Sequence, residues 1–234
     1  IEAISAAHEA MHSWREVPAK VRAQVLRRWF DLMMAHQEDL AIIMTTEQGK
    51  ALAESRGEVA YGAAFIEWFG EQAKRIDGDV IPAPSSDKRV VCIKQPIGVV
   101  AAITPWNFPF LIACWKVAPA LAAGNSVVLK PASLTPLTAL MLGQLAQEAG
   151  LPDGVLQVVP GSGSEAGNAL ATHPLVRKIG FTGSTEVGAT IMKLAADDIK
   201  RVSLELGGKS PNIVFADADW QRAAAESPMS VFAN

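Results

Sequence analysis

From about residue 88 onward, short apolar runs rich in β-branched residues alternate with longer helical segments. Strands are predicted, in chain order, at 90–93, 99–103, 126–130, 155–159, 176–181, 201–206 and 212–215. Helices are predicted between them at about 109–123, 136–149, 164–171 and 185–195. Strands that are apolar on both faces and alternate with helices indicate a parallel sheet covered on both sides. The sequence therefore predicts an α/β fold with a Rossmann-like sheet.

The first third of the chain predicts helices. Val17-Pro18 is typical of a helix start, and an apolar stripe at spacings of three and four follows it between Val21 and Met33. Gly49 fits a helix end. A longer helix is predicted from about Leu52 to Arg75, and we interpret its aromatic cluster as core packing rather than a ligand cage. That cluster consists of Phe65, Ile66, Trp68 and Phe69.

Composition excludes several classes of protein. Half of the residues are apolar and only 19% are charged, which excludes a disordered chain. Acidic residues outnumber basic ones by 24 to 21, so we expect no nucleic-acid partner. No apolar run approaches the ~20 residues of a membrane span, so we expect no membrane association. Cys92 and Cys114 form neither a disulfide framework nor a metal-binding spacing, which favours a cytoplasmic protein without a metal site.

Ligand sites in such sheets lie beyond the carboxyl ends of the strands. The segment 161–166 matches the glycine pattern of a dinucleotide site and opens a helix. No acidic residue follows at the expected distance, where Gly180 and Phe181 stand, so a plain glycine turn fits equally well. The segment 183–188 starts a helix, where its N–H groups and hydroxyls are suited to bind an anion. The alternative is a simple N-cap of that helix. Lys130 lies at the end of a strand. It is either a solvated strand terminus or a residue that contacts a ribose or phosphate.

Two further strand ends carry groups suited to catalysis. Asn107 lies between two prolines in the segment 104–109, where its amide is free to donate to an oxyanion, or else caps the next helix. Glu205 ends an apolar strand beside two glycines, so we expect partial desolvation to raise its pKa toward that of a general base. The alternative for Glu205 is a salt bridge to a nearby lysine.

Four of these segments, 104–109, 130–133, 181–188 and 205–211, occur in the same order and at similar separations in the aldehyde dehydrogenase superfamily, which this sequence resembles over essentially its whole length. The resemblance implies that residues 1–234 form the NAD(P)-binding domain of such an enzyme. Further segments are most similar to bacterial NADP-dependent succinate-semialdehyde dehydrogenases; they are 65–69, 88–89, 94–98 and 130–133.

The resemblance also implies a mechanism. A cysteine thiolate attacks the aldehyde, and a backbone N–H and the amide of Asn107 hold the oxyanion. Hydride passes to the nicotinamide of NADP or NAD, and water activated by Glu205 releases the acid from the thioester. The residues implied to bind the cofactor are Thr104, Pro105, Trp106, Asn107, Lys130, Ser133, Gly163, Gly183, Ser184, Val187 and Leu206.

Specificity follows from two positions where this chain departs from members of the family. Ser133 stands where NAD-preferring members carry a glutamate, which favours NADP. Trp115 stands where succinate-semialdehyde members carry an arginine, and Phe108, Phe110 and Trp115 are expected to form an apolar entrance. Succinate semialdehyde is the first substrate to test, with uncharged aliphatic or aromatic aldehydes as the alternative. The family resemblance implies a homodimer or homotetramer.

The nucleophile of the family lies in the motif Phe-x-Asn-x-Gly-Gln-x-Cys. The chain begins at Ile1 and stops at Phe232-Ala233-Asn234, five residues before that cysteine, and neither Cys92 nor Cys114 fits its place. We therefore expect a piece of a longer enzyme, whose targeting signal, if any, lies outside the sequence. The alternative is a non-catalytic nucleotide-binding or structural protein.

Overall fold

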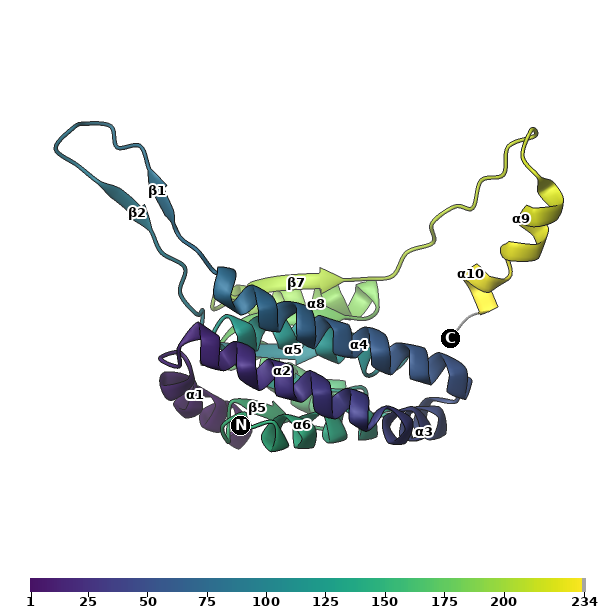
Figure 1. Ribbon diagram of the computed structural model, residues 1–234, viewed down its shortest axis with the longest axis horizontal. Coiled ribbons are helices and arrows are strands. Elements are labelled where there is room, and N and C mark those ends of the chain that lie inside the picture. Colours follow the sequence, from purple (N-terminus) through teal and green to yellow (C-terminus); the bar gives the residue numbers. More distant parts are fainter. Residues whose placement is uncertain (233–234) are drawn as a thin grey trace.

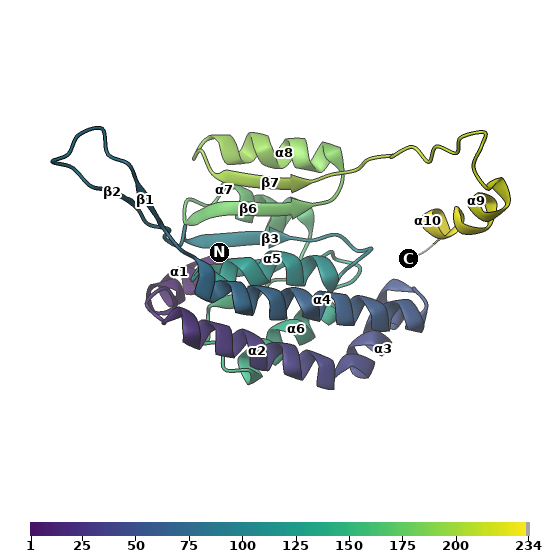
Figure 2. The ribbon, with the colours of Figure 1, turned by 45° about the horizontal axis from the view of Figure 1, so that its top comes forward.

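A computed structural model describes residues 1–232 of the chain. Its centre is a parallel sheet of five strands in the order β5-β4-β3-β6-β7. Figure 2 shows β3, β6 and β7 side by side. The strands are β3 (Val99–Ile103), β4 (Ser126–Lys130), β5 (Leu156–Val158), β6 (Val176–Thr182) and β7 (Arg201–Glu205). The chain runs outward from β3 through β4 to β5, then returns to the other side of β3 with β6 and β7. The predicted α/β class and parallel sheet are confirmed.

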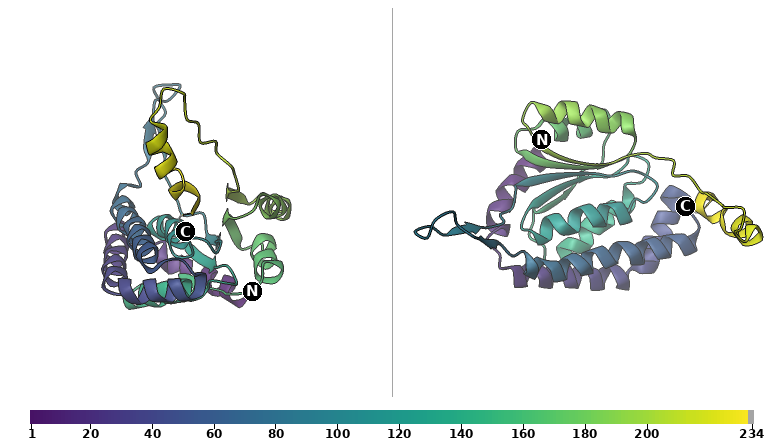
Figure 3. Two further views of the ribbon diagram at one scale, coloured as in Figure 1. Left: turned by 90° about the vertical axis from the view of Figure 1, so that its right-hand side faces the viewer. Right: turned by 90° about the horizontal axis from the view of Figure 1, so that it is seen from above.

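Helices cover both faces of the sheet (Figure 3). On one face lie α5 (Leu111–Ala122) and α6 (Leu137–Glu148), under an outer layer of α2 (Ala19–Ala35), α3 (Gln37–Gln48) and α4 (Leu52–Gln72). On the other face lie α1 (Glu2–Trp14), α7 (Asn168–Thr172) and α8 (Thr185–Ala196). The alternation along β3 divides the core accordingly. Val100 and Ala102 pack toward α5, whereas Val99, Ala101 and Ile103 pack toward α1 and α7.

The N-terminal helices begin and end close to the predicted residues. Pro18 precedes α2, and Gly49 ends α3 with a positive φ of 95° that favours glycine. The aromatic cluster of α4 is only partly a core feature, because Ile66 is buried and Phe65 and Phe69 are half-buried. Trp68 is 56% exposed, so the prediction of core packing is wrong for this residue.

Two segments extend away from the body of the protein (Figure 1). After the single-turn helix η1 (Ala73–Arg75), strands β1 (Asp79–Ile81) and β2 (Val90–Cys92) form an antiparallel hairpin. The strand predicted at 90–93 therefore exists but lies outside the parallel sheet, and its partner β1 was not predicted.

The second segment follows β7. The strand predicted at 212–215 is wrong, because residues 206–215 form neither helix nor strand. Ile213 and Phe215 are exposed, and no neighbouring strand in the described part of the chain pairs with them. The helices α9 (Trp220–Glu226) and α10 (Met229–Phe232) end the described chain.

Close packing between α4 and α5 depends on Gly62. A Cβ atom at Gly62 would lie 2.8 Å from Cδ1 of the buried Phe110 and 3.3 Å from Sγ of Cys114. Overpacking of this kind typically costs about 1–3 kcal/mol, so we expect Gly62→Ala to lower the Tm of the protein. Gly57→Ala is the matched control, because a Cβ there meets no atom within 4 Å on the same helix. It is expected to raise the Tm, and equal effects of the two variants would contradict the packing argument.

Candidate functional site

The predicted site residues follow the carboxyl ends of the five parallel strands. The chain changes direction between β3 and β6, so the crevice at which such sheets bind ligands lies between the ends of these two strands. Strand register places Ile103 beside Lys130 on one side and beside Phe181 on the other. Thr182 is paired with Glu205 in the same way. The fold thus brings the four motif segments to one edge of the sheet.

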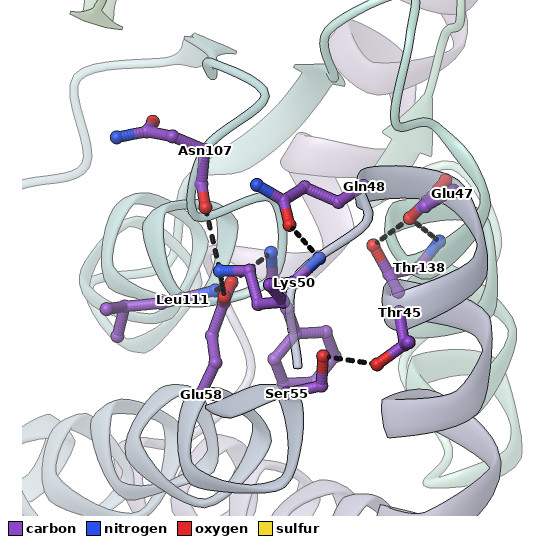
Figure 4. A network of polar contacts seen from close by, with 10 residues as sticks. Thr45, Glu47, Gln48, Lys50, Ser55, Glu58, Asn107, Leu111 and Thr138 are labelled. Atoms are coloured by element: carbon purple, nitrogen blue, oxygen red, sulfur yellow. Dashed lines mark hydrogen bonds and ion pairs between the residues drawn. The ribbon is translucent and has the colours of Figure 1, made fainter. Parts of the chain in front are cut away.

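The loop after β3 presents the side chain of Asn107. Its amide makes no hydrogen bond within residues 1–232, and Figure 4 shows it pointing away from the polar groups beneath the loop. The alternative that Asn107 caps α5 is wrong, because that helix begins after Phe110 without a side-chain cap from the loop. The predicted free donor is therefore present.

Lys50 and Glu58 hold the backbone of this loop, and neither residue was predicted from the sequence. The Lys50 ammonium donates to the backbone carbonyl of Asn107 at 2.8 Å. Glu58 Oε1 accepts from the backbone N–H groups of Phe110 and Leu111 at 3.0 and 3.1 Å. The available signal was a glutamate among the small and apolar residues that face the core on α4.

At the end of β4, Lys130 is buried and its ammonium donates to the carbonyl of Pro131 at 2.9 Å. Burial lowers its pKa, so the interpretation as a solvated strand end is wrong. Ser133 donates to the carbonyl of Gly161 at 3.0 Å, which joins this loop to the glycine turn after β5. Gly163 is exposed in that turn, where the backbone forms one turn of π-helix over Gly163–Gly167.

At the end of β6, Ser184 is the N-cap of α8 and accepts from the N–H of Val187 at 3.3 Å. This cap occupies one N–H group of the first turn. The N–H groups before it have no partner inside a helix and remain suited to an anion, so the cap and the anion site are compatible. Val187 is 47% exposed on this turn. The side-chain oxygens of Thr104 and Thr182, at the ends of β3 and β6, are buried without a hydrogen-bond partner in the described chain.

At the end of β7, Glu205 is exposed, so the expected desolvation is not seen. The reason is its place on an edge strand, where nothing in residues 1–232 covers it. The alternative salt bridge is absent as well, since no described lysine lies within 4.0 Å of its carboxylate. The backbone is fixed nonetheless, because the Glu205 carbonyl accepts from the N–H of Gly183 at 3.0 Å. The next residue, Leu206, lies against Gly188 of α8.

A cavity of about 310 Å³ lies beside α5 above β3, β6 and β7, with Glu205 in its lining. Trp115 and Lys116 line it from the helix. Burial lowers the pKa of Lys116 to about 8, an effect that the charge of Glu205 partly opposes. Lys116 was not among the predicted site residues, and its signal was a lysine on an otherwise apolar helix.

The predicted apolar entrance is only partly formed. Phe110 is fully buried in the core, because it packs under Gly62, so its assignment to an entrance is wrong. Phe108 is half-buried with the Lys50 ammonium 4.4 Å from its ring centre. Trp115 is half-buried and contacts Phe65 with ring centres 6.1 Å apart.

Neither cysteine is exposed at the carboxyl ends of the parallel strands. Cys92 is exposed on the hairpin, and Cys114 is buried inside α5, where burial raises the pKa of its thiol well above the ordinary value. Residues 233–234, which belong to the expected nucleophile motif, lie outside the described part of the chain. Among residues 1–232, no three His, Cys, Asp or Glu side chains are grouped to hold a metal ion. No helix in this range is long and apolar enough to cross a membrane.

Comparisons with known proteins identify the family that the chain matches. Residues 1–234 match the profile of the Aldehyde dehydrogenase family. The chain is 58% identical, over 232 residues, to the glutarate-semialdehyde dehydrogenase of Pseudomonas aeruginosa and to an NADP(+) succinate-semialdehyde dehydrogenase of Escherichia coli. Each alignment covers 99% of this chain and 48% of the relative.

Solved structures give the same result for the fold. The crystal structure of an E. coli NADP-dependent enzyme matches 97% of this chain and 47% of its own, with a TM-score of 0.95 and 58% identity. The structure of PnpE in complex with nicotinamide adenine dinucleotide matches 98% of this chain and 47% of its own, with a TM-score of 0.95 and 42% identity. The chain thus spans about half the length of the relatives that it matches.

Proposed function

Because this chain belongs to the aldehyde dehydrogenase family, we propose that it is the cofactor-binding part of an enzyme that oxidises an aldehyde to a carboxylic acid with NADP or NAD. The observation that carries the proposal is the convergence of the 104–109, 130–133, 181–188 and 205–211 segments on one edge of the sheet. The nucleophilic thiol is expected from a part of the protein outside the present sequence, since Cys92 and Cys114 lie elsewhere.

The residues at the crevice fit a dinucleotide. The first turn of α8 offers N–H groups to a pyrophosphate, with Gly183 and Ser184 at its start. Lys130 and Ser133 would contact the adenosine ribose, and Gly163 would lie near the adenine side of the cofactor. The loop from Thr104 to Asn107, together with Val187 and Leu206, would hold the nicotinamide side of the cofactor. The buried hydroxyls of Thr104 and Thr182, which have no partner among residues 1–232, mark unused hydrogen-bonding capacity at the same strand ends.

Within the reaction, the amide of Asn107 donates to the oxygen that becomes negative when the thiolate adds to the aldehyde. A donor aimed at developing charge stabilises the transition state more than the ground state. NADP or NAD, when bound, would supply the acceptor for the hydride of the substrate carbon. The carboxylate of Glu205 then takes a proton from the water that attacks the thioester, which releases the acid.

The finer proposal concerns the substrate, for which a semialdehyde with a distal carboxylate is the first choice. The names of the two relatives at 58% identity, a glutarate- and a succinate-semialdehyde dehydrogenase, support it. An aromatic row supports uncharged aldehydes instead. Tyr61, Phe65 and Trp115 follow one another with ring centres 5.4 and 6.1 Å apart, and Trp115 offers a single N–H to a carboxylate.

The test is kcat/KM of the full-length protein for succinate semialdehyde, glutarate semialdehyde, an aliphatic aldehyde and an aromatic aldehyde. We expect one of the two semialdehydes to be the best substrate. An uncharged aldehyde that is better by about tenfold or more, equivalent to about 1.4 kcal/mol, would assign specificity to the aromatic row. Binding of NADP without turnover of any aldehyde would show a nucleotide-binding protein that is not an enzyme.

We also expect the enzyme to use NADP at least as well as NAD, and Ser133→Glu to shift the preference toward NAD by tenfold or more. A carboxylate at this position repels a 2′-phosphate, and at ~4 Å the interaction of two unit charges is about 4 kcal/mol with an effective dielectric near 20. Exposure of Ser133 reduces that value. The measurement is the ratio of kcat/KM for the two cofactors.

Ser133→Ala is the matched control, because it removes the hydrogen bond to Gly161 without adding charge. We expect the cofactor ratio of this control to stay within about threefold of the unsubstituted ratio. A better use of NAD than of NADP by the unsubstituted enzyme would contradict the prediction.

A further inference from the structure

We propose that the buried pair Lys50–Glu58 consists of positioning residues that hold the loop of Asn107 in the geometry required by the oxyanion. The inference deepens the proposed function and rests on it. It concerns two side chains on the N-terminal helices and their connection, about fifty residues before the loop that they contact.

The pair is almost completely removed from solvent. The exposed fractions of the Lys50 and Glu58 side chains are 1% and 2%, and their charged atoms lie 2.5 Å apart. The Lys50 ammonium also donates to the carbonyl of Asn107 at 2.8 Å (Figure 4). It lies 4.4 Å from the ring centre of Phe108 as well. One cation therefore links α4 to the part of the loop that carries the oxyanion donor.

Glu58 fixes the other end of the same loop. Its Oε1 accepts from the N–H groups of both Phe110 and Leu111, where α5 begins. A negative charge at a helix N-terminus is favourable, and here it satisfies two N–H groups that have no partner inside the helix. Together, Lys50 and Glu58 hold the backbone on both sides of Phe108 and Pro109.

Stability alone is a poor reason for such a pair, because replacing a buried ion pair by apolar groups is often neutral or stabilising. Its effect on geometry is specific. The Asn107 side chain has no hydrogen bond of its own within the described residues, so its direction depends on the backbone that Lys50 holds. A displacement of a catalytic group by 1 Å can lower a rate by about 10²-fold.

The decisive variant in the full-length enzyme is Lys50→Met combined with Glu58→Gln. It leaves no unpaired buried charge, and the glutamine oxygen still accepts from Phe110 and Leu111. The variant removes the donor to the Asn107 carbonyl, together with the ion pair itself and the contact of the ammonium with the Phe108 ring. We expect kcat to fall by about tenfold or more, while KM for NADP changes by less than about threefold and the circular dichroism stays that of a folded protein.

The matched control is Arg56→Met combined with Glu38→Gln. This ion pair also joins the N-terminal helices, with an Arg56 Nε–Glu38 Oε2 distance of 2.7 Å, but it is exposed and does not contact the loop. We expect its kcat to equal that of the unsubstituted enzyme. A folded Lys50→Met/Glu58→Gln enzyme with kcat within about twofold of the control would overturn the proposal.

A second measurement separates positioning from general damage. Combined with Asn107→Ala, Lys50→Met/Glu58→Gln should lower kcat by less than a further twofold or so, because the group that it positions is already gone. If Lys50→Met/Glu58→Gln lowers kcat by the same factor in the Asn107→Ala background as it does with Asn107 present, the effect is due to general disruption.

Hydrogen exchange of the backbone amides from 104 to 111 tests the positioning without any turnover. We expect faster exchange in Lys50→Met/Glu58→Gln than in the control, and unchanged exchange would contradict the inference. If the unsubstituted enzyme oxidises no aldehyde, the proposed function fails, while this measurement still decides whether the pair orders the loop.

Discussion

Replacement of Asn107 by alanine is expected to lower kcat of the full-length enzyme by roughly 10²–10³-fold, the usual cost of removing one oxyanion donor. The protein should remain folded, because the Asn107 amide makes no hydrogen bond within residues 1–232 and does not cap α5. The start of that helix is held by Glu58 instead. The measurement is kcat with the best aldehyde, together with the Tm of the variant.

Asn107→Asp provides the control for shape. It keeps the size of the side chain but replaces the donor with an acceptor that carries negative charge, so the loss should be at least as large as with alanine. An unchanged kcat in either folded variant would leave Asn107 without a role in catalysis. A large fall in Tm together with the loss of kcat would instead indicate a structural function for the loop.

The central sheet was predictable because its strands leave a clear local signal. The run at 99–103 is apolar along its whole length and the run at 126–130 is apolar at its centre, as expected for strands buried on both faces, and the structure places β3 and β4 at these residues. Since parallel strands end at one edge, the motifs after them were expected to meet there. The register of β3, β6 and β7 confirms that they do.

The incorrect predictions concern segments whose neighbours in the fold cannot be deduced from local composition. The run at 212–215 is as apolar as a buried strand, yet no strand in the described chain pairs with it. Glu205 ends an apolar run but lies on the edge strand β7, so it is exposed. Phe110 belongs to an aromatic segment but turns into the core, because Gly62 leaves room for its ring.

The support of the loop was not predictable for a different reason. Lys50 and Glu58 lie about fifty residues before the atoms that they bind. From the pattern of a single helix, charged side chains of this kind are predicted to be exposed. Only the packing of α4 against α5 brings Glu58 to the N–H groups of Phe110 and Leu111. The proposed oxyanion donor was therefore predictable from the sequence, whereas the contacts proposed to orient it required the three-dimensional structure.

Substitution of Glu205 by glutamine is expected to separate the two halves of the reaction. The side chain is exposed, and its backbone carbonyl keeps its bond to the N–H of Gly183, so cofactor binding should stay nearly intact. The substitution removes the proposed base that activates water, and general-base catalysis typically contributes about 10²–10⁴-fold. A single turnover of NADPH formation should persist while steady-state turnover falls by a factor in that range.

Rapid mixing followed by steady-state assay measures both phases in one experiment, with Glu148→Gln as the control. Glu148 is also an exposed carboxylate, but it is the last residue of α6 and lies at the edge of the sheet opposite to that of Glu205. Its substitution should leave both phases unchanged. If Glu205→Gln keeps steady-state turnover within a few-fold, another group activates the water. In that case Lys116, which lines the same cavity with a pKa of about 8, becomes the next residue to substitute, because its neutral form is available as a base near that pH.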